Sequence, residues 1–142
     1  MTAPVRGSCL CGAVRFELDP PARRASHCHC SRCRKHSGAF GLSQLRVARE
    51  RFRLLAGGER LRAYRPAGGK AKVFCAGCGS SLFGGDWPDG AEISVRLGAL
   101  DDDPGTRPQY HSFVDSRAPW EVLPDDGLPR HPGAAPKQEP SP

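Results

Sequence analysis

The chain has 142 residues, enough for one domain and short for two, and no stretch approaches the roughly 20 apolar residues that a membrane span requires. Leu, Val, Ile and Phe make up about 18% of the residues, so the composition excludes a fold that depends on a large apolar core alone. The net charge of +6 is concentrated in residues 1–72, which favours a small anionic ligand or an Arg-rich solvated surface, and no run of five like charges marks a nucleic-acid-binding arm.

Short segments of alternating polarity run along the chain, separated by Gly- and Pro-containing turns. The predicted strands, in chain order, are 11–18, 40–47, 52–55, 60–65, 91–100 and 110–114. Residues 25–29 and 72–75 each lead into a cysteine knuckle, and residues 82–83 continue beyond the second knuckle. Residues 31–37 can form one short helix that Gly38 closes. Short strands at this spacing predict a mainly β, mostly antiparallel fold with little helix.

The clearest alternation lies in residues 91–100. It places Ile93, Val95 and Leu97 on a buried face and the residues between them, among them Ser94 and Arg96, on the solvent face. Beyond residue 124 the composition changes to Pro, Gly and charged residues, which predicts one domain over 1–129 and a flexible tail over 130–142.

Seven cysteines fall into three closely spaced groups. The first is a C-x-C, the second a C-x-C-x-x-C and the third a C-x-x-C followed by glycine: Cys9 and Cys11; Cys28, Cys30 and Cys33; Cys75 and Cys78. The start of the chain shows no apolar signal core, so we expect a cytoplasmic, reducing location, where clustered cysteines are metal ligands or catalytic groups rather than disulfides.

Seven cysteines divide naturally into four and three. Two pairs from distant segments make a closed, structural tetrahedral zinc site, for which we choose Cys9, Cys11, Cys75 and Cys78. Such a site contributes on the order of 10 kcal/mol to folding, which offsets the thin core. The remaining three ligands, Cys28, Cys30 and Cys33, lie within six residues and can hold a second zinc with its fourth position open, as in catalytic sites.

Other readings of the cysteines remain open. Disulfides would use six of the seven, a single zinc would leave three ordinary thiols, and an iron–sulfur cluster is compatible with the spacing. One of the flanking histidines, His27, His29 or His36, could also complete the coordination of the second group and close that site.

Several motifs together resemble the glutathione-dependent formaldehyde-activating (GFA) family and its GFA/CENP-V-type domain. The motifs are Gly7–Val14, Cys28–Lys35 with Ser37-Gly38, Phe74–Gly79, Leu97–Asp101, and His111 to Asp115 with Pro119-Trp120. The resemblance runs from about Gly7 to about Pro129 and includes all seven cysteines in the family order. It implies an Mss4-like fold and the same division of cysteines between two zinc ions, one structural and one open.

The resemblance also implies an activity: a carbon–sulfur lyase reaction, run in the synthetic direction, that joins glutathione and formaldehyde into S-hydroxymethylglutathione. In that reading the open site at Cys28, Cys30 and Cys33 is catalytic, because a thiol must become a thiolate before it attacks a carbonyl. Three neighbouring cations, Arg32, Arg34 and Lys35, are candidates to bind the glutathione carboxylates. His36 could relay a proton. The expected partners are therefore a small thiol and a small aldehyde.

Two other classes of function remain as alternatives. One is a zinc-stabilised scaffold or glutathione carrier without turnover. The other is a nucleic-acid- or protein-binding module, which the basic N-terminal half allows, although few aromatic residues lie near the cysteines and no recognition-helix pattern is present.

Overall fold

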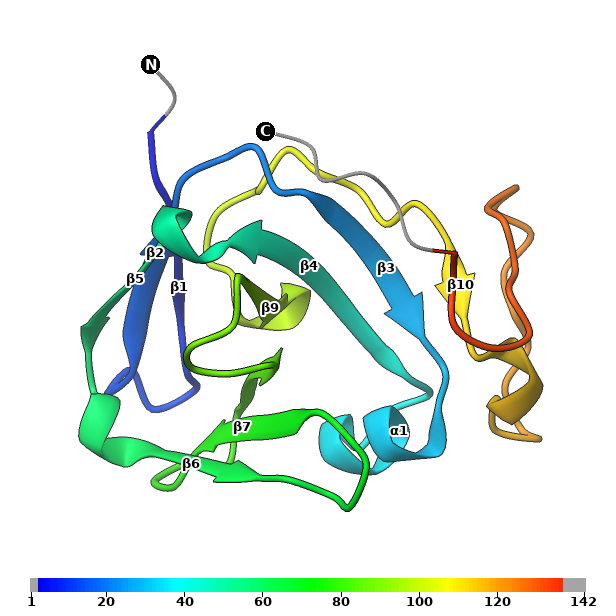
Figure 1. Ribbon diagram of the computed structural model, residues 1–142, viewed down its shortest axis with the longest axis horizontal. Helices are drawn as coiled ribbons and strands as arrows, with labels where there is room; N and C mark the ends of the chain where they lie inside the picture. Colours follow the sequence, from blue (N-terminus) through cyan, green and yellow to red (C-terminus); the bar gives the residue numbers. More distant parts are fainter. Residues whose placement is uncertain (1–2, 137–142) are drawn as a thin grey trace.

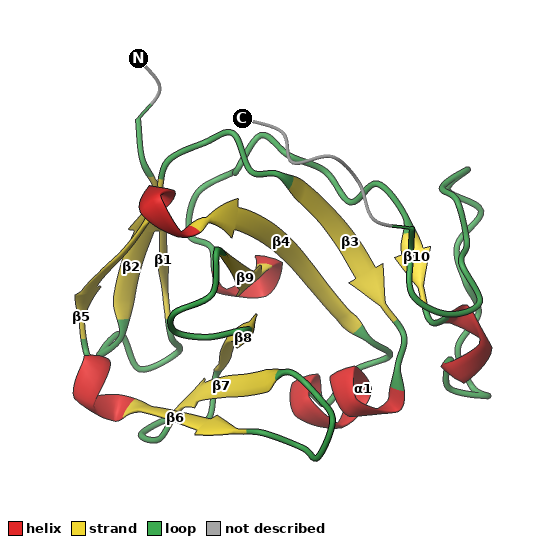
Figure 2. Cartoon of the chain, in the orientation of Figure 1, coloured by secondary structure: helices red, strands yellow, loops and turns green. Residues whose placement is uncertain are grey.

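The computed structural model describes residues 3–136 and consists mainly of short strands joined by turns (Figures 1 and 2). A three-stranded sheet has the order β1-β2-β5 and a seven-stranded sheet the order β10-β3-β4-β9-β8-β7-β6. The strands are β1 (Val5–Ser8), β2 (Arg15–Leu18), β3 (Arg24–Cys28), β4 (Leu42–Ala48), β5 (Phe52–Ala56), β6 (Leu61–Tyr64), β7 (Ala71–Cys75), β8 (Ser81–Gly85), β9 (Glu92–Arg96) and β10 (His111–Ser112). The mainly β fold predicted from the sequence is confirmed.

One α-helix, α1 (Ser31–Ser37), lies in the described part of the chain, and short 3-10 turns occupy Arg49–Arg51, Gly58–Arg60, Leu97–Ala99 and Val114–Ser116. The Cys30 side chain accepts a hydrogen bond from the Cys33 N–H and so caps the start of α1. Gly38 ends it in the left-handed conformation, at φ 74°, and donates its N–H to the Arg34 carbonyl. None of the helices in residues 3–136 is long and apolar enough to cross a membrane.

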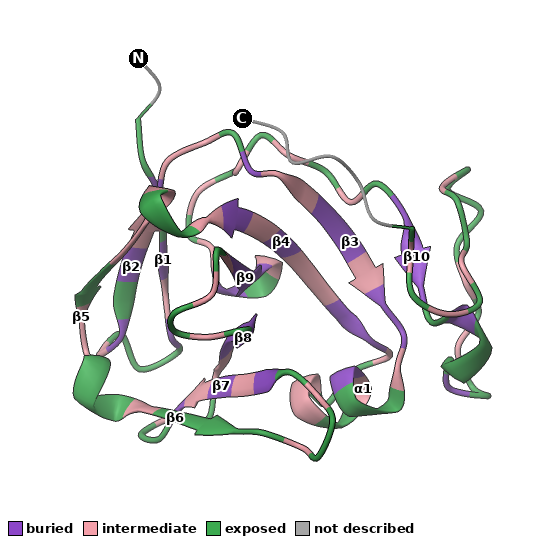
Figure 3. Ribbon diagram, in the orientation of Figure 1, coloured by how far each residue is buried: buried purple, intermediate pink, exposed green. Residues whose placement is uncertain are grey.

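A cluster of aromatic rings packs where the two sheets meet. Phe16, from β2, is fully buried and lies 4.9 Å from the Phe83 ring of β8 in an edge-to-face contact. Phe52 and Trp87 complete the cluster, with Trp87 stacked on Phe83 at 4.6 Å. Along β2 and β7, buried residues alternate with more accessible ones (Figure 3), and the buried ones belong to this core.

The expectation that β9 is half exposed is wrong. Ser94 and Arg96 are as deeply buried as Ile93 and Val95, so both faces of β9 are covered. The Ser94 hydroxyl donates to the Gln44 Oε1 atom at 2.6 Å, which satisfies it in the interior. The polar face of this strand therefore points toward a buried site rather than toward solvent.

The last predicted strand is shorter than expected, and it runs parallel to its neighbour β3. Only His111 and Ser112 pair, in parallel with β3, whereas the other neighbouring pairs of described strands are antiparallel. The strand ends because Phe113 adopts a left-handed conformation at φ 55°. The sequence analysis also missed β1, which precedes the first cysteine.

The predicted boundary at residue 129 lies in a segment that pairs with β10. The His131 N–H donates to the His111 carbonyl at 2.9 Å, and the Phe113 N–H donates to the Gly133 carbonyl at 2.9 Å. Residues 137–142 of the expected tail lie outside the described residues.

Candidate metal centres and the adjoining cavity

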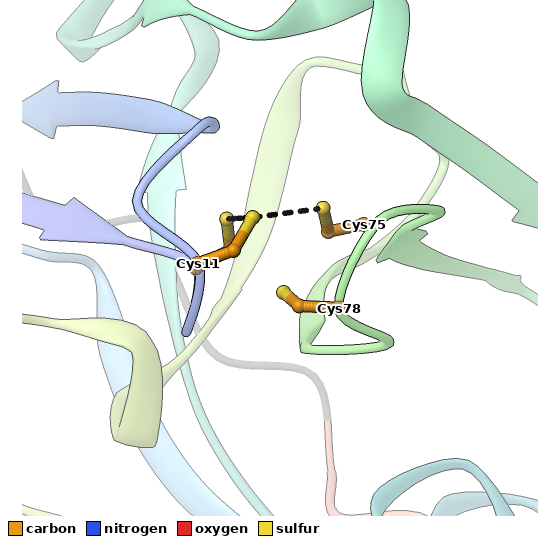
Figure 4. Close-up of side chains that lie close together, drawn as sticks. Cys11, Cys75 and Cys78 are labelled. Carbon is orange, nitrogen blue, oxygen red and sulfur yellow. Dashed lines mark hydrogen bonds between the residues drawn. The ribbon is translucent and has the colours of Figure 1, made fainter.

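Four cysteine sulfurs converge between two turns that belong to different sheets. Cys9 and Cys11 come from the turn after β1, Cys75 ends β7, and Cys78 lies in the turn between β7 and β8 (Figure 4). All four Sγ atoms lie within 4.8 Å of one another, with 3.5 Å between Cys9 and Cys11 and 4.0 Å between Cys11 and Cys75. Tetrahedral zinc with Zn–S bonds of about 2.3 Å places its sulfurs about 3.8 Å apart, so this donor set fits the ion.

The backbone around this cluster supports the sulfurs. The Val14 N–H donates to the Cys9 Sγ atom at 3.3 Å, and the Ser80 hydroxyl lies 3.2 Å from the Cys78 Sγ atom. Gly79, at φ 78°, lets its N–H reach back to the Cys75 carbonyl at 2.7 Å and closes the knuckle. The hydroxyl contact is the main reason that the pKa of Cys78 is lowered, to about 5, which favours its thiolate as a ligand.

The second cluster forms where β3 leads into α1. Cys28 ends β3, Cys30 caps α1 and Cys33 lies in its first turn, and their three sulfurs lie within 4.8 Å of one another. Cys28 and Cys33 are buried, with their Sγ atoms 3.3 Å apart, whereas Cys30 is partly exposed. Hydrogen bonds from the other two thiols, chiefly from Cys28, lower the pKa of Cys30. The hydrogen bonds that Cys28 shares with Cys30, and Cys33 with Cys28, are the main reason that the pKa values of Cys28 and Cys33 are raised. A divalent cation would relieve this crowding of like groups.

Among the described residues, no histidine nitrogen belongs to this three-sulfur group. His27 instead bonds through Nδ1 to the Ser43 hydroxyl at 2.7 Å, and His29 through Nε2 to His111 Nδ1 at 2.9 Å. His36 has a buried Nε2 atom without a partner in residues 3–136, and burial is the main reason that its pKa is lowered to about 4. All seven cysteines are free thiols, which argues against the disulfide alternative.

A cavity of about 240 Å³ opens beside the three-cysteine cluster and is lined by its three sulfur-bearing residues. The other side chains around it are mainly cationic, and no Asp or Glu of the described residues lines it. The cations are Arg32, Arg46, Lys70, Lys72 and Arg96. Larger hollows, of about 660 and 710 Å³, are lined by none of the three cysteines, so we take the small basic cavity as the candidate site.

Of the three cations suggested by the sequence, the structure brings Arg32 to this cavity. Arg34 donates to the Ser116 carbonyl at 3.4 Å and Lys35 is exposed, and neither lines the cavity. Their contacts with glutathione stay a prediction.

Several lining cations were missed by the sequence analysis. Lys72 lies in β7 and Lys70 directly before its first residue, and a period-2 pattern extended to residue 70 would have placed both on one face. The Lys72 Nζ atom lies 3.7 Å from the Cys33 Sγ atom. Arg96 had been assigned to the solvent face, and no sequence signal marks it as buried.

Comparisons with known proteins identify the family to which the chain belongs. The family model described as "Glutathione-dependent formaldehyde-activating enzyme" matches residues 4–116. A Halomonas elongata protein, whose provisional name is also glutathione-dependent formaldehyde-activating enzyme, is 28% identical over 125 residues, covering 82% of this chain and 78% of its own. A crystal structure of a Rhodobacter sphaeroides protein superposes with a TM-score of 0.56 at 27% identity, over 70% of this chain and 92% of that one. The chain therefore belongs to the glutathione-dependent formaldehyde-activating enzyme family.

Proposed function

We propose that this protein catalyses adduct formation between a thiol, glutathione or a close analogue, and a small aldehyde such as formaldehyde, and that it holds two zinc ions. The observation that carries the proposal is the convergence of three sulfurs at the wall of a small cationic cavity. Membership of the family supports the same reaction class. A reducing compartment such as the cytoplasm fits two cysteine clusters that together need seven free thiols.

The two cysteine clusters take different parts in this proposal. Cys9, Cys11, Cys75 and Cys78 would hold a structural ion that ties the turn after β1 to the turn after β7. Cys28, Cys30 and Cys33 would hold an ion with an open position, and zinc bound in this way lowers the pKa of a thiol that approaches it.

The lining residues would orient the thiol substrate. Arg32, from the first turn of α1, would bind a carboxylate of glutathione by charge-assisted hydrogen bonds. Burial of Cys28 and Cys33 keeps water away from one side of the sulfur cluster, while the partly exposed Cys30 faces the entry. A bound thiol then attacks the aldehyde carbon, and the former carbonyl oxygen takes a proton to give the hemithioacetal.

The test measures the exchange between hydrated formaldehyde and S-hydroxymethylglutathione at equilibrium by ¹³C NMR, with and without zinc-loaded protein. We expect the protein to accelerate exchange by more than about tenfold, or about 1.4 kcal/mol in the barrier. Cys30→Ala should remove the acceleration, whereas Arg62→Gln, an exposed residue on β6, should not. Exchange no faster than in buffer would favour the carrier or scaffold alternative.

Cobalt substitution supplies a second measurement that does not depend on turnover. Glutathione should change the thiolate-to-cobalt absorption of the protein, and S-methylglutathione, which cannot form a thiolate, should change it much less. Equal responses would contradict thiol binding at the open site.

A further inference from the structure

Arg96 is a buried cation without an acidic partner. Its side chain lies on β9 and is 4% exposed, and no Asp or Glu of residues 3–136 pairs with it. Its Nη1 atom donates to the neutral acceptors Gln44 Oε1 at 3.2 Å and Ser94 Oγ at 2.9 Å, while Nε is buried without a partner. Burial lowers the pKa of Arg96 to about 10, so the guanidinium still carries its charge at neutral pH. Buried charges in proteins are normally paired, so this one calls for an anion.

The surrounding backbone makes room for the Arg96 guanidinium. A Cβ atom at Gly84, on the neighbouring strand β8, would come within 2.6 Å of Nη2 and 2.9 Å of Nη1. Any other residue at position 84 would push the guanidinium away, so glycine there allows it to lie where it does. Together with Gln44 and Ser94, this fixes the guanidinium at the wall of the cavity that Cys28, Cys30 and Cys33 also line.

The three cysteines account for only part of the positive charge around the cavity. Three thiolates on a divalent cation carry one net negative charge, which Lys72, 3.7 Å from the Cys33 sulfur, can balance. Arg46 and Lys70 have acidic partners, Glu92 at 3.5 Å and Asp86 at 2.8 Å. Arg96 and Arg32, which donates to the Ala67 carbonyl, are left without an acidic partner among the described residues. The cavity therefore carries positive charge that the protein does not balance and that an anionic ligand can balance.

The size of the cavity and the position of Arg96 restrict which anion fits. At about 240 Å³ the cavity is much smaller than the hollows of about 660 and 710 Å³, so it suits a small molecule better than an enclosed tripeptide such as glutathione together with an aldehyde. Each carboxylate of glutathione is separated from its sulfur by a peptide link, so these groups suit the exposed edge of the cavity. A carboxylate that shares the buried space with the reacting sulfur must be attached close to the carbon that the sulfur attacks.

We propose that the cavity binds the carboxylate of a small aldehyde whose carbonyl carbon is bonded directly to that carboxylate, a 2-oxo acid, and that Arg96 is its anchor. This inference rests on the proposed thiol–aldehyde chemistry. The carboxylate takes a bidentate contact on the Arg96 guanidinium, which places the aldehyde carbon toward the cysteine cluster. The thiolate sulfur forms the C–S bond, the C=O π electrons move to oxygen, and that oxygen takes a proton from water, so the step needs no oxidant or reductant.

The first test is binding to the zinc-loaded protein, measured by isothermal titration calorimetry. Oxamate, a stable 2-oxo acid analogue that does not react with thiols, should bind one per chain, whereas uncharged acetamide should not. Arg96→Gln should weaken oxamate binding by at least tenfold, Arg96→Lys by less, and the control Arg62→Gln not at all. Oxamate binding that is equal in wild type and Arg96→Gln would overturn the proposal.

The second test compares glyoxylate with methylglyoxal, a similar aldehyde without the carboxylate, as partners of glutathione. Each catalysed rate is divided by its own rate in buffer. In wild type this rate ratio should be at least tenfold higher for glyoxylate than for methylglyoxal. Arg96→Gln should raise the KM for glyoxylate at least tenfold and change the KM for methylglyoxal less than twofold. If Arg96→Gln does not fold, the wild-type preference decides by itself, and a ratio near one overturns the inference.

The remaining outcomes separate this inference from its rivals. If Arg96→Gln loses the same share of the catalysed rate with both aldehydes and also loses the second zinc, then Arg96 only balances the thiolate charges. That result would overturn the inference. If the glyoxylate effect disappears when cysteamine, a thiol without carboxylates, replaces glutathione, then Arg96 binds the thiol substrate and the assignment to the aldehyde is wrong. Acceleration with formaldehyde but no glyoxylate preference overturns the inference alone, whereas no acceleration with any aldehyde overturns the proposed function.

Discussion

The Nε2 atom of His29 lies 2.9 Å from the Nδ1 atom of His111, 82 residues further along the chain, and the Nε2 atom of His111 lies 2.7 Å from Asp126 Oδ2. At neutral pH the carboxylate accepts from His111, so a neutral His111 accepts in turn from His29. His29 stands between Cys28 and Cys30. This chain of hydrogen bonds therefore connects the three-cysteine cluster with the segment that follows β10.

Asp126→Asn should weaken that connection and lower the melting temperature at pH 7. Hydrogen bonding to His111 is the main reason that the pKa of Asp126 is lowered, so its contribution is present above the usual carboxyl range and is lost as pH falls through the lowered value. The difference between variant and wild type should thus shrink as the pH falls. Asp125→Asn, at the exposed neighbour, is the control and should melt like wild type. Identical melting of the two variants would show that the His111 contact does not stabilise the fold.

The two cysteine clusters should respond differently to loss of one ligand. Cys78→Ala removes a ligand of the proposed structural zinc site. Sites of this kind contribute on the order of 10 kcal/mol, about the whole stability of a domain, so the variant should be unfolded. Cys30→Ala should lose one zinc per chain and keep the wild-type circular dichroism spectrum. Metal analysis and circular dichroism check both results, and an equal loss of structure would contradict the division into a structural and an open site.

Gly7 tests the packing of the small sheet against the core. A Cβ atom at position 7 would overlap the ring of Phe16 and approach the Ala99 carbonyl oxygen at 2.8 Å. Gly7→Ala should therefore lower the free energy of unfolding by about 1–3 kcal/mol, measured with urea. Gly98→Ala is the matched control, because nothing lies within 4 Å of its Cβ position, and it should stay within about 0.5 kcal/mol of wild type. Equal stability of the two variants would mean that β1 shifts to make room.

His36 should make the fold sensitive to mild acid. Burial is the largest cause of its low pKa of about 4, followed by the positive charges of Arg96 and Lys72. The unfolded chain takes up a proton at this histidine near pH 6.5, whereas the native state does so only near pH 4, so native stability falls as the pH drops through that window. His36→Gln should lose less stability than wild type between pH 7 and pH 5 in urea titrations. Parallel losses would place the acid sensitivity elsewhere, for example at the cysteine ligands.

Local sequence was enough to predict much of this molecule. The short strands follow from alternating polarity, and α1 follows from a short polar segment that ends at Gly38. The spacing of the cysteines predicted the same two groups whose sulfurs the structure brings together, because few ways exist to place two C-x-C-type pairs around one point. The strands, α1 and each cysteine motif depend on residues close together in the chain. The joining of Cys9 and Cys11 with the pair that begins 64 residues after Cys11 was predicted from the number of cysteines instead.

Tertiary structure decided the character of the cavity. Alternation in β9 assigns every second side chain, Arg96 among them, to the exterior, but that face is buried too and lines the cavity beside the three cysteines. The approach of Lys72 to Cys33, and of His111 to His29, joins residues 39 and 82 positions apart. Strand order sets such distances, and strand order depends on how the whole sheet packs, which no local pattern encodes.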